Sequence, residues 1–312
     1  MKGSVRVTSM KKYASFDFHL HSWWSYDACA PVEYYFQRAK ELGLHAFAVT
    51  DHNNNDALGE IRKVAQQYPE VGFVSGAELT ACTPYGQLDL VCLGLPLEPT
   101  PEFVQLQKEY RAYNQNMGDA ISLLVEKMGH SYTREERKKL LEQYRPGFTL
   151  ELQGITHVRN EIQAEYMVKK SVVKTRAEFY SYLWGENRIP GLLPMTPDAE
   201  KVVRIVHQAG GLVFLAHPYL YSFKEEKRLD ALLEVLDLDG IECAHSMIPA
   251  EYTAFYRQYC VKRHLLSTAG TDVHSDPPHA HLHLSDGCDM AVHLGEDSWM
   301  EEILERVEIH HG

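Results

Sequence analysis

Short apolar runs alternate with amphipathic helical patterns along most of the chain. Runs rich in β-branched and aromatic residues, bounded by polar or turn residues, are typical of buried strands. Seven such runs occur, at residues 14–20, 45–50, 71–77, 88–94, 212–217, 239–243 and 265–270. Helical patterns lie between most of them, at residues 31–42, 56–67, 197–209, 249–263 and 297–308. Strands that alternate with helices predict βαβ units and a largely parallel sheet.

The alternation stops between Gly94 and Gly191, where only helical patterns occur. These patterns cover residues 101–128, 133–144, 158–171 and 175–184. A structureless loop of this length is uncommon inside a compact domain, so we expect an inserted helical subdomain. The predicted fold is an α/β barrel with seven strands, formed by residues 13–94 and 191–309 and interrupted by a helical insertion at residues 95–190.

Residue types that bind metals lie at or just after most of the predicted strands. They are His19 and His21 at the first, Asp51 and His52 at the second, Glu78 at the third, His217 at the fifth, Glu242 and His245 at the sixth, and Asp272 and His274 at the seventh. Each motif alone has a structural explanation, such as a helix cap, an ion pair or a turn. Catalytic groups of α/β barrels come from the carboxyl ends of several strands, so the recurrence favours a metal site.

The spacing of these residues also suits metal binding. Side chains alternate along a strand, so His19 and His21 share one face, as do Asp272 and His274. A carboxylate such as Glu78 has two oxygens and can bridge two cations. Imidazole combined with carboxylate suits Zn, Mn or Fe better than Mg or Ca.

Composition narrows the class of substrate. The chain has 31 Lys and Arg against 43 Asp and Glu, a net charge of −12, which argues against a surface for duplex nucleic acid. An anionic substrate then needs local positive charge, such as bound cations. Six dispersed cysteines form no CxxC pair and are interpreted as reduced thiols. The first residues lack the apolar segment of a signal peptide and no stretch is long enough for a membrane span, so a soluble cytoplasmic protein is expected.

Six ordered segments resemble the PHP (polymerase and histidinol phosphatase) superfamily. They read DFHLHSWWSYDA, AVTDHN, VSGAEL, VFLAHP, GIECAHS and GTDVHS, and they extend over nearly the whole chain. The resemblance is strongest to the stand-alone phosphoesterase branch, which includes nucleoside-monophosphate and nucleotide 3′,5′-bisphosphate 5′-phosphatases. It implies a distorted seven-stranded (β/α) barrel with two or three divalent transition-metal ions, namely Mn, Zn or Fe.

The resemblance also implies which residues bind the ions. His19, His21, Glu78 and Asp272 look like the ligands of one ion, and Asp27, His52 and His274 like those of a second. Glu78 would bridge to a third ion held partly by His217, with His157 as the last ligand or His245 as a substitute. The family commonly has Ser-Asp-Gly where this chain reads Ser25-Tyr26-Asp27-Ala28.

The reaction implied by the resemblance is hydrolysis of a phosphate monoester of a nucleotide by metal-activated water. Coordination lowers the pKa of water from about 15.7 towards roughly 7. Glu78, His217 and Asp272 are the catalytic candidates. The insertion is expected to recognise the substrate through Arg159 and Arg176, because guanidinium groups bind phosphate bidentately, although both can equally be solvated helix charges. Arg159 is the expected contact to a second anionic group of the substrate, remote from the scissile phosphate. His245 is the third candidate for substrate binding.

Two other functions are compatible with parts of the pattern. Amidohydrolase-type deaminases and amidases also combine a first-strand His-x-His with later His and Asp ligands. A catalytically idle metal-binding module would have lost some ligands, whereas almost all are present here. The exact substrate, the native metal, the general acid and the oligomeric state stay open at this point. The run PPHAHLH, with His279, His281 and His283, is interpreted as a solvated loop.

Overall fold

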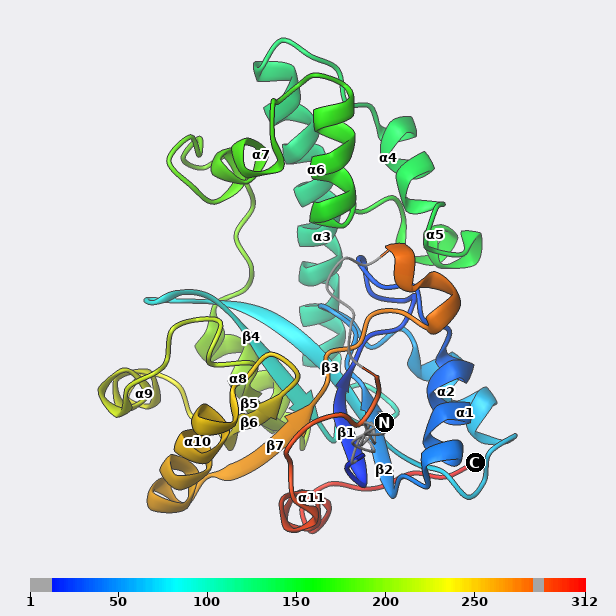
Figure 1. Ribbon diagram of the computed structural model, residues 1–312, viewed down its shortest axis with the longest axis vertical. Helices are drawn as coiled ribbons and strands as arrows, with labels where there is room; N and C mark the ends of the chain where they lie inside the picture. Colours follow the sequence, from blue (N-terminus) through cyan, green and yellow to red (C-terminus); the bar gives the residue numbers. More distant parts are fainter. Residues whose placement is uncertain (1–12, 283–288) are drawn as a thin grey trace, which may run out of the picture.

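A computed structural model describes residues 13–282 and 289–312 and contains one seven-stranded sheet rolled into a barrel (Figure 1). The strands are β1 (Phe16–Leu20), β2 (Ala46–Val49), β3 (Gly72–Thr83), β4 (Gly86–Leu93), β5 (Leu212–Leu215), β6 (Gly240–His245) and β7 (Leu266–Gly270). Their order in the sheet follows the sequence. A parallel bridge between Leu20 and Val273 links the end of β1 to the segment after β7. The predicted α/β barrel with seven strands is confirmed.

The middle of the sheet differs from the predicted parallel pattern. β4 runs antiparallel to both β3 and β5, whereas the other neighbouring strands are parallel. β3 and β4 form a hairpin with its turn at residues 84–85, directly before Gly86, whose φ of 107° favours glycine. β3 is also longer than predicted, so Glu78 lies within the strand and not at its end. The hairpin register pairs Glu78 with Val91 and Thr80 with Asp89.

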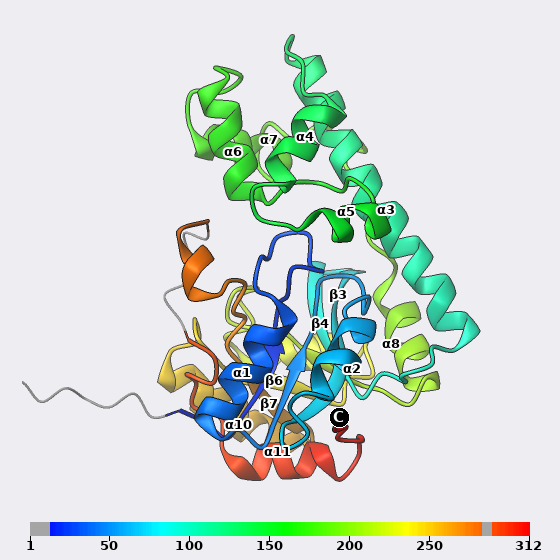
Figure 2. The ribbon, with the colours of Figure 1, turned by 90° about the vertical axis from the view of Figure 1, so that its right-hand side faces the viewer.

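Helices pack around the barrel, as Figures 1 and 2 show. They are α1 (Val32–Leu42), α2 (Leu58–Ala65), α8 (Ala199–Gln208), α9 (Glu226–Leu233), α10 (Ala250–Arg263) and α11 (Asp297–Leu304), of which α9 was not predicted. α1 begins after Pro31 and ends at Gly43, which has a left-handed φ of 67°. Among the described residues, no helix has both the length and the apolar character needed to cross a membrane.

Five further helices form the region between β4 and α8. They are α3 (Pro101–Lys127), α4 (Arg134–Leu141), α5 (Gly147–Gln153), α6 (Asn160–Lys169) and α7 (Arg176–Leu183). α3 is 27 residues long and extends from the barrel to the other four helices (Figures 1 and 2). Buried side chains of this region, among them Ile121, Leu141 and Phe179, form a further hydrophobic cluster, which also includes Cys29 from the loop after β1.

The insertion contacts the loop that follows β1. The Tyr144 hydroxyl donates to the Tyr26 carbonyl at 2.8 Å, and the Arg145 Nε donates to the Trp23 carbonyl at 3.2 Å. Nη1 of Arg159 donates to the Asp27 carbonyl at 2.9 Å. The loop that carries Asp27 is therefore held between the barrel and the insertion.

Candidate metal centre

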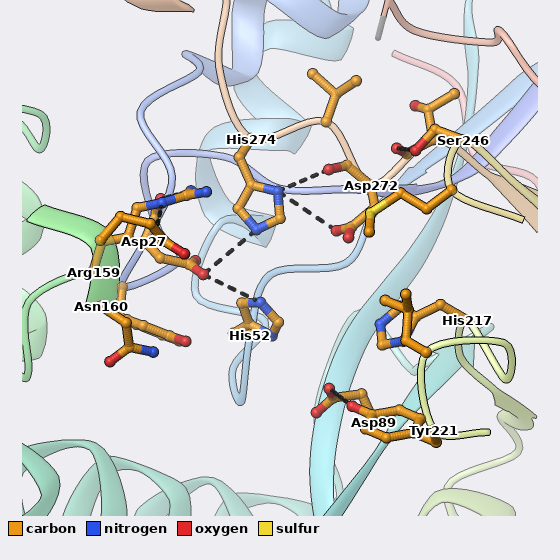
Figure 3. A pocket seen from close by; sticks show the side chains of 16 residues that line it. Asp27, His52, Asp89, Arg159, Asn160, His217, Tyr221, Ser246, Asp272 and His274 are labelled. Carbon is orange, nitrogen blue, oxygen red and sulfur yellow. Dashed lines mark hydrogen bonds and ion pairs between the residues drawn. The ribbon is translucent and has the colours of Figure 1, made fainter. Parts of the chain in front are cut away.

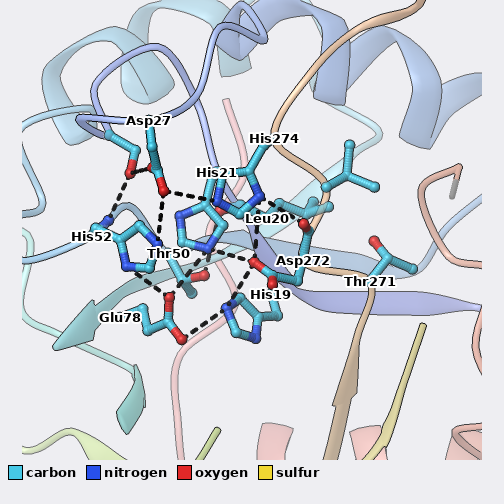
Figure 4. A network of polar contacts seen from close by, with 12 residues as sticks. His19, Leu20, His21, Asp27, Thr50, His52, Glu78, Thr271, Asp272 and His274 are labelled. Atoms are coloured by element: carbon cyan, nitrogen blue, oxygen red, sulfur yellow. Dashed lines mark hydrogen bonds and ion pairs between the residues drawn. The ribbon is translucent and has the colours of Figure 1, made fainter. Parts of the chain in front are cut away.

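Two histidines and two carboxylates meet at the carboxyl end of β1 (Figure 4). Nε2 of His19 lies 3.3 Å from Oε1 of Glu78 and 3.5 Å from Oδ1 of Asp272. Nε2 of His21 lies 2.9 Å from the same Asp272 oxygen and 3.3 Å from Oε2 of Glu78. One ligand atom from each of the four residues falls within 4.8 Å of all the others. The structure thus brings together the first predicted set of ligands.

The second predicted set meets beside the first. Oδ2 of Asp27 lies 3.5 Å from Nε2 of His52 and 3.5 Å from Nε2 of His274. Its other oxygen, Oδ1, accepts a hydrogen bond of 2.9 Å from the Ser25 hydroxyl. The additional residue relative to Ser-Asp-Gly, Tyr26, does not displace Asp27 from the histidines.

A third group combines Glu78, Asp89 and His217, whose ligand atoms also lie within 4.8 Å of one another. Nε2 of His217 lies 2.9 Å from Oε1 of Glu78, and the Tyr221 hydroxyl donates a hydrogen bond to Asp89. Sequence reasoning did not identify Asp89. Its only signal was one carboxylate in the apolar run of residues 88–94, and the antiparallel placement of β4 brings it to His217.

His157 lies apart from these three groups. Its ring is 3.9 Å from that of Tyr26, centroid to centroid, and it shares no cluster of ligand atoms among the described residues. Burial lowers the pKa of His157 to about 4. Asp89 occupies the position next to Glu78 and His217 that the sequence suggested for His157.

Hydrogen bonds to the distal ring nitrogens orient the ligand histidines. Nδ1 of His19 donates to Oε1 of Glu242 at 2.9 Å, so Nε2 is the ring atom that faces Glu78 and Asp272 and can bind a cation in place of its proton. Oε2 of Glu242 accepts the backbone N–H of His217 at 2.6 Å. Nδ1 of His274 donates to the Asp272 carbonyl at 2.8 Å. Histidines that bind metals in proteins are held in the same way.

His245 has the opposite orientation. Its Nδ1 accepts the backbone N–H of Met247 at 3.0 Å, so Nε2 of the neutral ring carries the proton. That nitrogen lies 3.5 Å from Oδ2 of Asp272, and the side chain is fully buried. His245 is therefore oriented with its Nε2–H towards Asp272. It does not line either of the cavities described below.

Buried polar atoms in this cluster match the coordination needs of a cation. Nε2 of His19, Nε2 of His21, Oε2 of Glu78 and Oδ1 of Asp272 are buried and have no hydrogen-bond partner of suitable geometry among the described residues. Each such atom costs about 1–3 kcal/mol unless it is paired, and coordination to a cation pairs several at once. Imidazoles and carboxylates together are donors that bind divalent cations in proteins.

Electrostatics lead to the same conclusion. Burial alone would raise the pKa of Glu78, but the neighbouring imidazoles of His19 and His52 hold it well below its usual range. Burial alone would lower the pKa of His19, but Glu78, Glu242 and Asp272 hold it well above its usual range. These buried carboxylates require nearby positive charge, which protonated histidines or bound cations supply.

The backbone is strained at two of the candidate ligands. His217 has a φ of 27° and Asp272 a φ of 56°, both in the left-handed region that non-glycine residues rarely adopt. Such conformations cost about 1–3 kcal/mol each and cluster at functional sites. Here the N–H of His217 is bound by Glu242, and that of Asp272 by the His19 carbonyl.

The cluster opens into a cavity of about 480 Å³ (Figure 3). Its walls include Asp27, His52, Asp89, His217, Asp272 and His274 from the barrel and Arg159, Asn160 and Glu161 from the insertion. Nε of Arg159 is 2.9 Å from Oε2 of Glu161. Arg176 is exposed on α7, faces Glu165 at 3.3 Å and lines neither this cavity nor the next, so the structure does not bring it to the metal centre.

A second cavity, of about 600 Å³, continues from the first. Tyr26, His52, Asp89, Asn160 and Tyr221 line both. The second cavity lies between the β3–β4 hairpin and the insertion, and Tyr113, Met117, Leu183, Trp184, Arg188 and Met195 form much of its wall. It is therefore mainly apolar and aromatic.

Comparison with known proteins identifies relatives that match most of the chain. The 5′-3′ exoribonuclease Rnm of Escherichia coli is 26% identical over 84% of this chain and 86% of its own length. A 5′-3′ exoribonuclease of Haemophilus influenzae is 22% identical over 85% of this chain and 90% of its own length.

Solved structures share the fold. An amidohydrolase from Chromobacterium violaceum has a TM-score of 0.70 at 19% identity, covering 96% of this chain and 98% of its own. A protein from Bifidobacterium adolescentis, assigned as a metal-dependent phosphoesterase, has a TM-score of 0.69 at 20% identity, with the same coverage of 96% and 98%. A sequence model of the PHP domain matches residues 17–189. Because this match covers more than half of the chain, the protein belongs to the PHP domain family.

Proposed function

We propose that the protein hydrolyses the phosphate monoester of a nucleotide, either a nucleoside monophosphate or a 3′,5′-bisphosphate. The observation that carries this proposal is the pair of joined cavities. The first cavity is lined by candidate metal ligands together with Arg159. The second has an aromatic and apolar wall and is large enough for a nucleoside. The phosphate of a nucleotide suits the first cavity, and its base suits the second.

The protein side chains prepare the phosphate end of the site. A bound divalent transition-metal ion, Mn, Zn or Fe, would lower the pKa of water and offset charge on the phosphoryl oxygens. Glu78 is central, because its Oε1 faces His19 and His217 while its Oε2 faces His21 and His52. A carboxylate in this position can bridge neighbouring cations. Glu242 keeps Nε2 of His19 available as a ligand.

Arg159 is the candidate contact to the phosphate itself. Its bond to the Asp27 carbonyl and its ion pair with Glu161 hold it at the wall of the first cavity, where His274 and Asp272 also lie. This location supports a contact to the scissile phosphate more than to a remote second anion. We therefore expect Arg159→Ala to weaken hydrolysis of a nucleotide and of a small generic phosphomonoester by similar factors.

The second cavity is the candidate nucleoside site. Tyr113 and Trp184 provide aromatic surfaces for a base, and stacking on such a side chain is worth about 1–3 kcal/mol. Arg188 lines the same cavity, and no ion pair involves it within the described residues. It is a candidate partner for the additional phosphate of a bisphosphate substrate.

A second candidate function is removal of nucleotides from the 5′ end of RNA. The similar proteins of Escherichia coli and Haemophilus influenzae are named 5′-3′ exoribonucleases, and each resembles at least 84% of this chain. The joined cavities leave room beyond one phosphate. With a net charge of −12, the protein would hold only the terminal nucleotides and not a long phosphate backbone.

One substrate screen distinguishes these functions. The purified protein, with Mn, Zn, Fe or Mg added back, is assayed on mononucleotides, a nucleoside 3′,5′-bisphosphate, a short 5′-phosphorylated RNA and amides, with Glu78→Gln as the inactive control. Release of inorganic phosphate from mononucleotides or the bisphosphate supports the first proposal. Release of mononucleotides from RNA without free phosphate supports the second. Cleavage of amides alone contradicts both and supports the amidohydrolase interpretation.

A further inference from the structure

Three potential metal ligands meet outside the barrel centre. Cys29 lies in the loop after β1, while Asp276 and His279 lie after β7, at the 3₁₀ helix η1 (Pro277–Leu282). One ligand atom from each falls within 4.8 Å of the other two. Cys29 and Asp276 are 2% and 7% exposed, and the His279 side chain is 45% exposed. None of the three belongs to the ligand groups around Glu78.

The chemistry of this group matches a zinc-type cation. Thiolate, imidazole and carboxylate are the three side-chain ligands that zinc uses in proteins, and they normally surround it as a tetrahedron. Nδ1 of His279 and Oδ1 of Asp276 already face each other at 2.5 Å. A cation can replace the proton that they share, which is the usual exchange when a metal binds. The buried position of Cys29 disfavours the alternative role of an accessible nucleophile.

We propose that Cys29, Asp276 and His279 bind a zinc-class divalent cation, at a site separate from the barrel cluster. A tetrahedral cation held by three protein ligands would leave one position for solvent. His279 is then more than a solvated loop residue, because it faces a buried cysteine that is distant in sequence. His283, the last residue of the run PPHAHLH, lies outside the described residues.

The location suggests what such a cation does. Cys29 follows Asp27 by two residues, and Asp276 follows His274 by two residues. The backbone N–H of Cys29 also donates to the His274 carbonyl at 2.9 Å. In Figure 1 the orange segment after β7 lies beside the blue loop after β1. The cation would fasten the two loops that carry Asp27 and His274, and so hold the second group of barrel ligands in place.

Cobalt substitution tests this site independently of activity. The full chain is stripped of metal and reloaded with Co²⁺, and its near-ultraviolet spectrum is recorded. Only a thiolate ligand produces a sulfur-to-cobalt charge-transfer band, and no cysteine is present in the three barrel groups. We expect the band in the wild type and in Cys82→Ser, whose replaced thiol lies on β3, and its loss in Cys29→Ser.

His279→Ala provides a second variant, because 45% of the side chain is exposed and the change should therefore leave the core intact. We expect it to lose the charge-transfer band and one equivalent of bound metal per chain, measured by elemental analysis. In Glu78→Gln the band should persist, since that change affects only the barrel centre. Absence of the band in cobalt-loaded wild type overturns the proposal, as does its survival in Cys29→Ser or an unchanged metal content in His279→Ala. None of these outcomes depends on which phosphate ester the protein hydrolyses.

Discussion

Replacing Glu242 by glutamine should weaken metal binding although Glu242 itself is not a proposed ligand. The carboxylate accepts two hydrogen bonds, from Nδ1 of His19 at 2.9 Å and from the backbone N–H of His217 at 2.6 Å. Glutamine has one acceptor oxygen and one donor nitrogen, so it can satisfy only one of these two donors. If its oxygen stays with His217, its NH₂ group faces His19 and pushes the imidazole proton to Nε2, the atom proposed to bind the cation.

The size of the effect follows from this geometry. Loss of the partner that orients a metal-binding histidine costs about 10–100-fold in metal affinity. This range corresponds to about 1.4–2.8 kcal/mol, at 1.4 kcal/mol for each factor of ten. Because Glu242 is fully buried, solvent cannot replace the missing hydrogen bond. Turnover at saturating metal should fall less than affinity, since all proposed ligands are still present.

Competition against a chromogenic chelator measures the affinity of wild type and variant for Zn²⁺ or Mn²⁺. Glu98→Gln serves as the matched control, because the Glu98 side chain is 89% exposed and the same chemical change there should leave affinity unaltered. Nitrogen NMR of labelled histidine reports the tautomer of His19. Equal affinity of Glu242→Gln and wild type, with Nδ1 of His19 still protonated, would refute the assigned orientation.

The other predictions address metal dependence, packing and pH. Exhaustive chelation and the substitution Glu78→Gln should each abolish turnover, and full activity in verified metal-free protein would contradict the metal centre. Gly270→Ala should destabilise the fold and reduce metal content, because a Cβ there would overlap the His19 Cβ and lie 2.7 Å from the His19 backbone nitrogen, whereas Gly59→Ala has open space and should be tolerated. Overpacking of this kind costs about 1–3 kcal/mol, measurable by urea unfolding. Since burial lowers the pKa of His157 to about 4, the unfolded state binds more protons as pH falls from about 6.5 to about 4, and stability is lost in this window. Lowering the pH from about 7 to about 4.5 should therefore reduce the free energy of unfolding of His157→Gln by about 2–3 kcal/mol less than that of wild type.

Periodicity in the sequence was enough to predict the barrel. Strand and helix patterns depend on near neighbours along the chain, and their alternation limits the fold to a few architectures. The end of β3 was harder to predict from the sequence, because a strand that continues past Glu78 and a strand that ends there look alike over a few residues. Only pairing with β4 extends β3 to Thr83 and makes this part of the sheet antiparallel.

The candidate ligands His19, His52 and Asp272 were also predictable, because parallel strands bring their carboxyl ends to the same edge of a barrel. Asp89 and Glu242 gained their roles only from the folded structure, in which the hairpin and a buried hydrogen bond connect them to distant histidines.

The insertion and the loops show the limits of local patterns most clearly. Arg159 and Arg176 are equivalent as sequence, yet one lines the cavity and the other pairs with Glu165 at the surface. Cys29 and His279 are separated by most of the chain, and nothing near either residue indicates the other. The sequence by itself determined most of the secondary structure, the seven-stranded barrel and the residues near its strand ends. Tertiary structure decided the extent of β3 and which distant side chains meet, because register, loop path and packing of the helices against the barrel depend on contacts that no local pattern encodes.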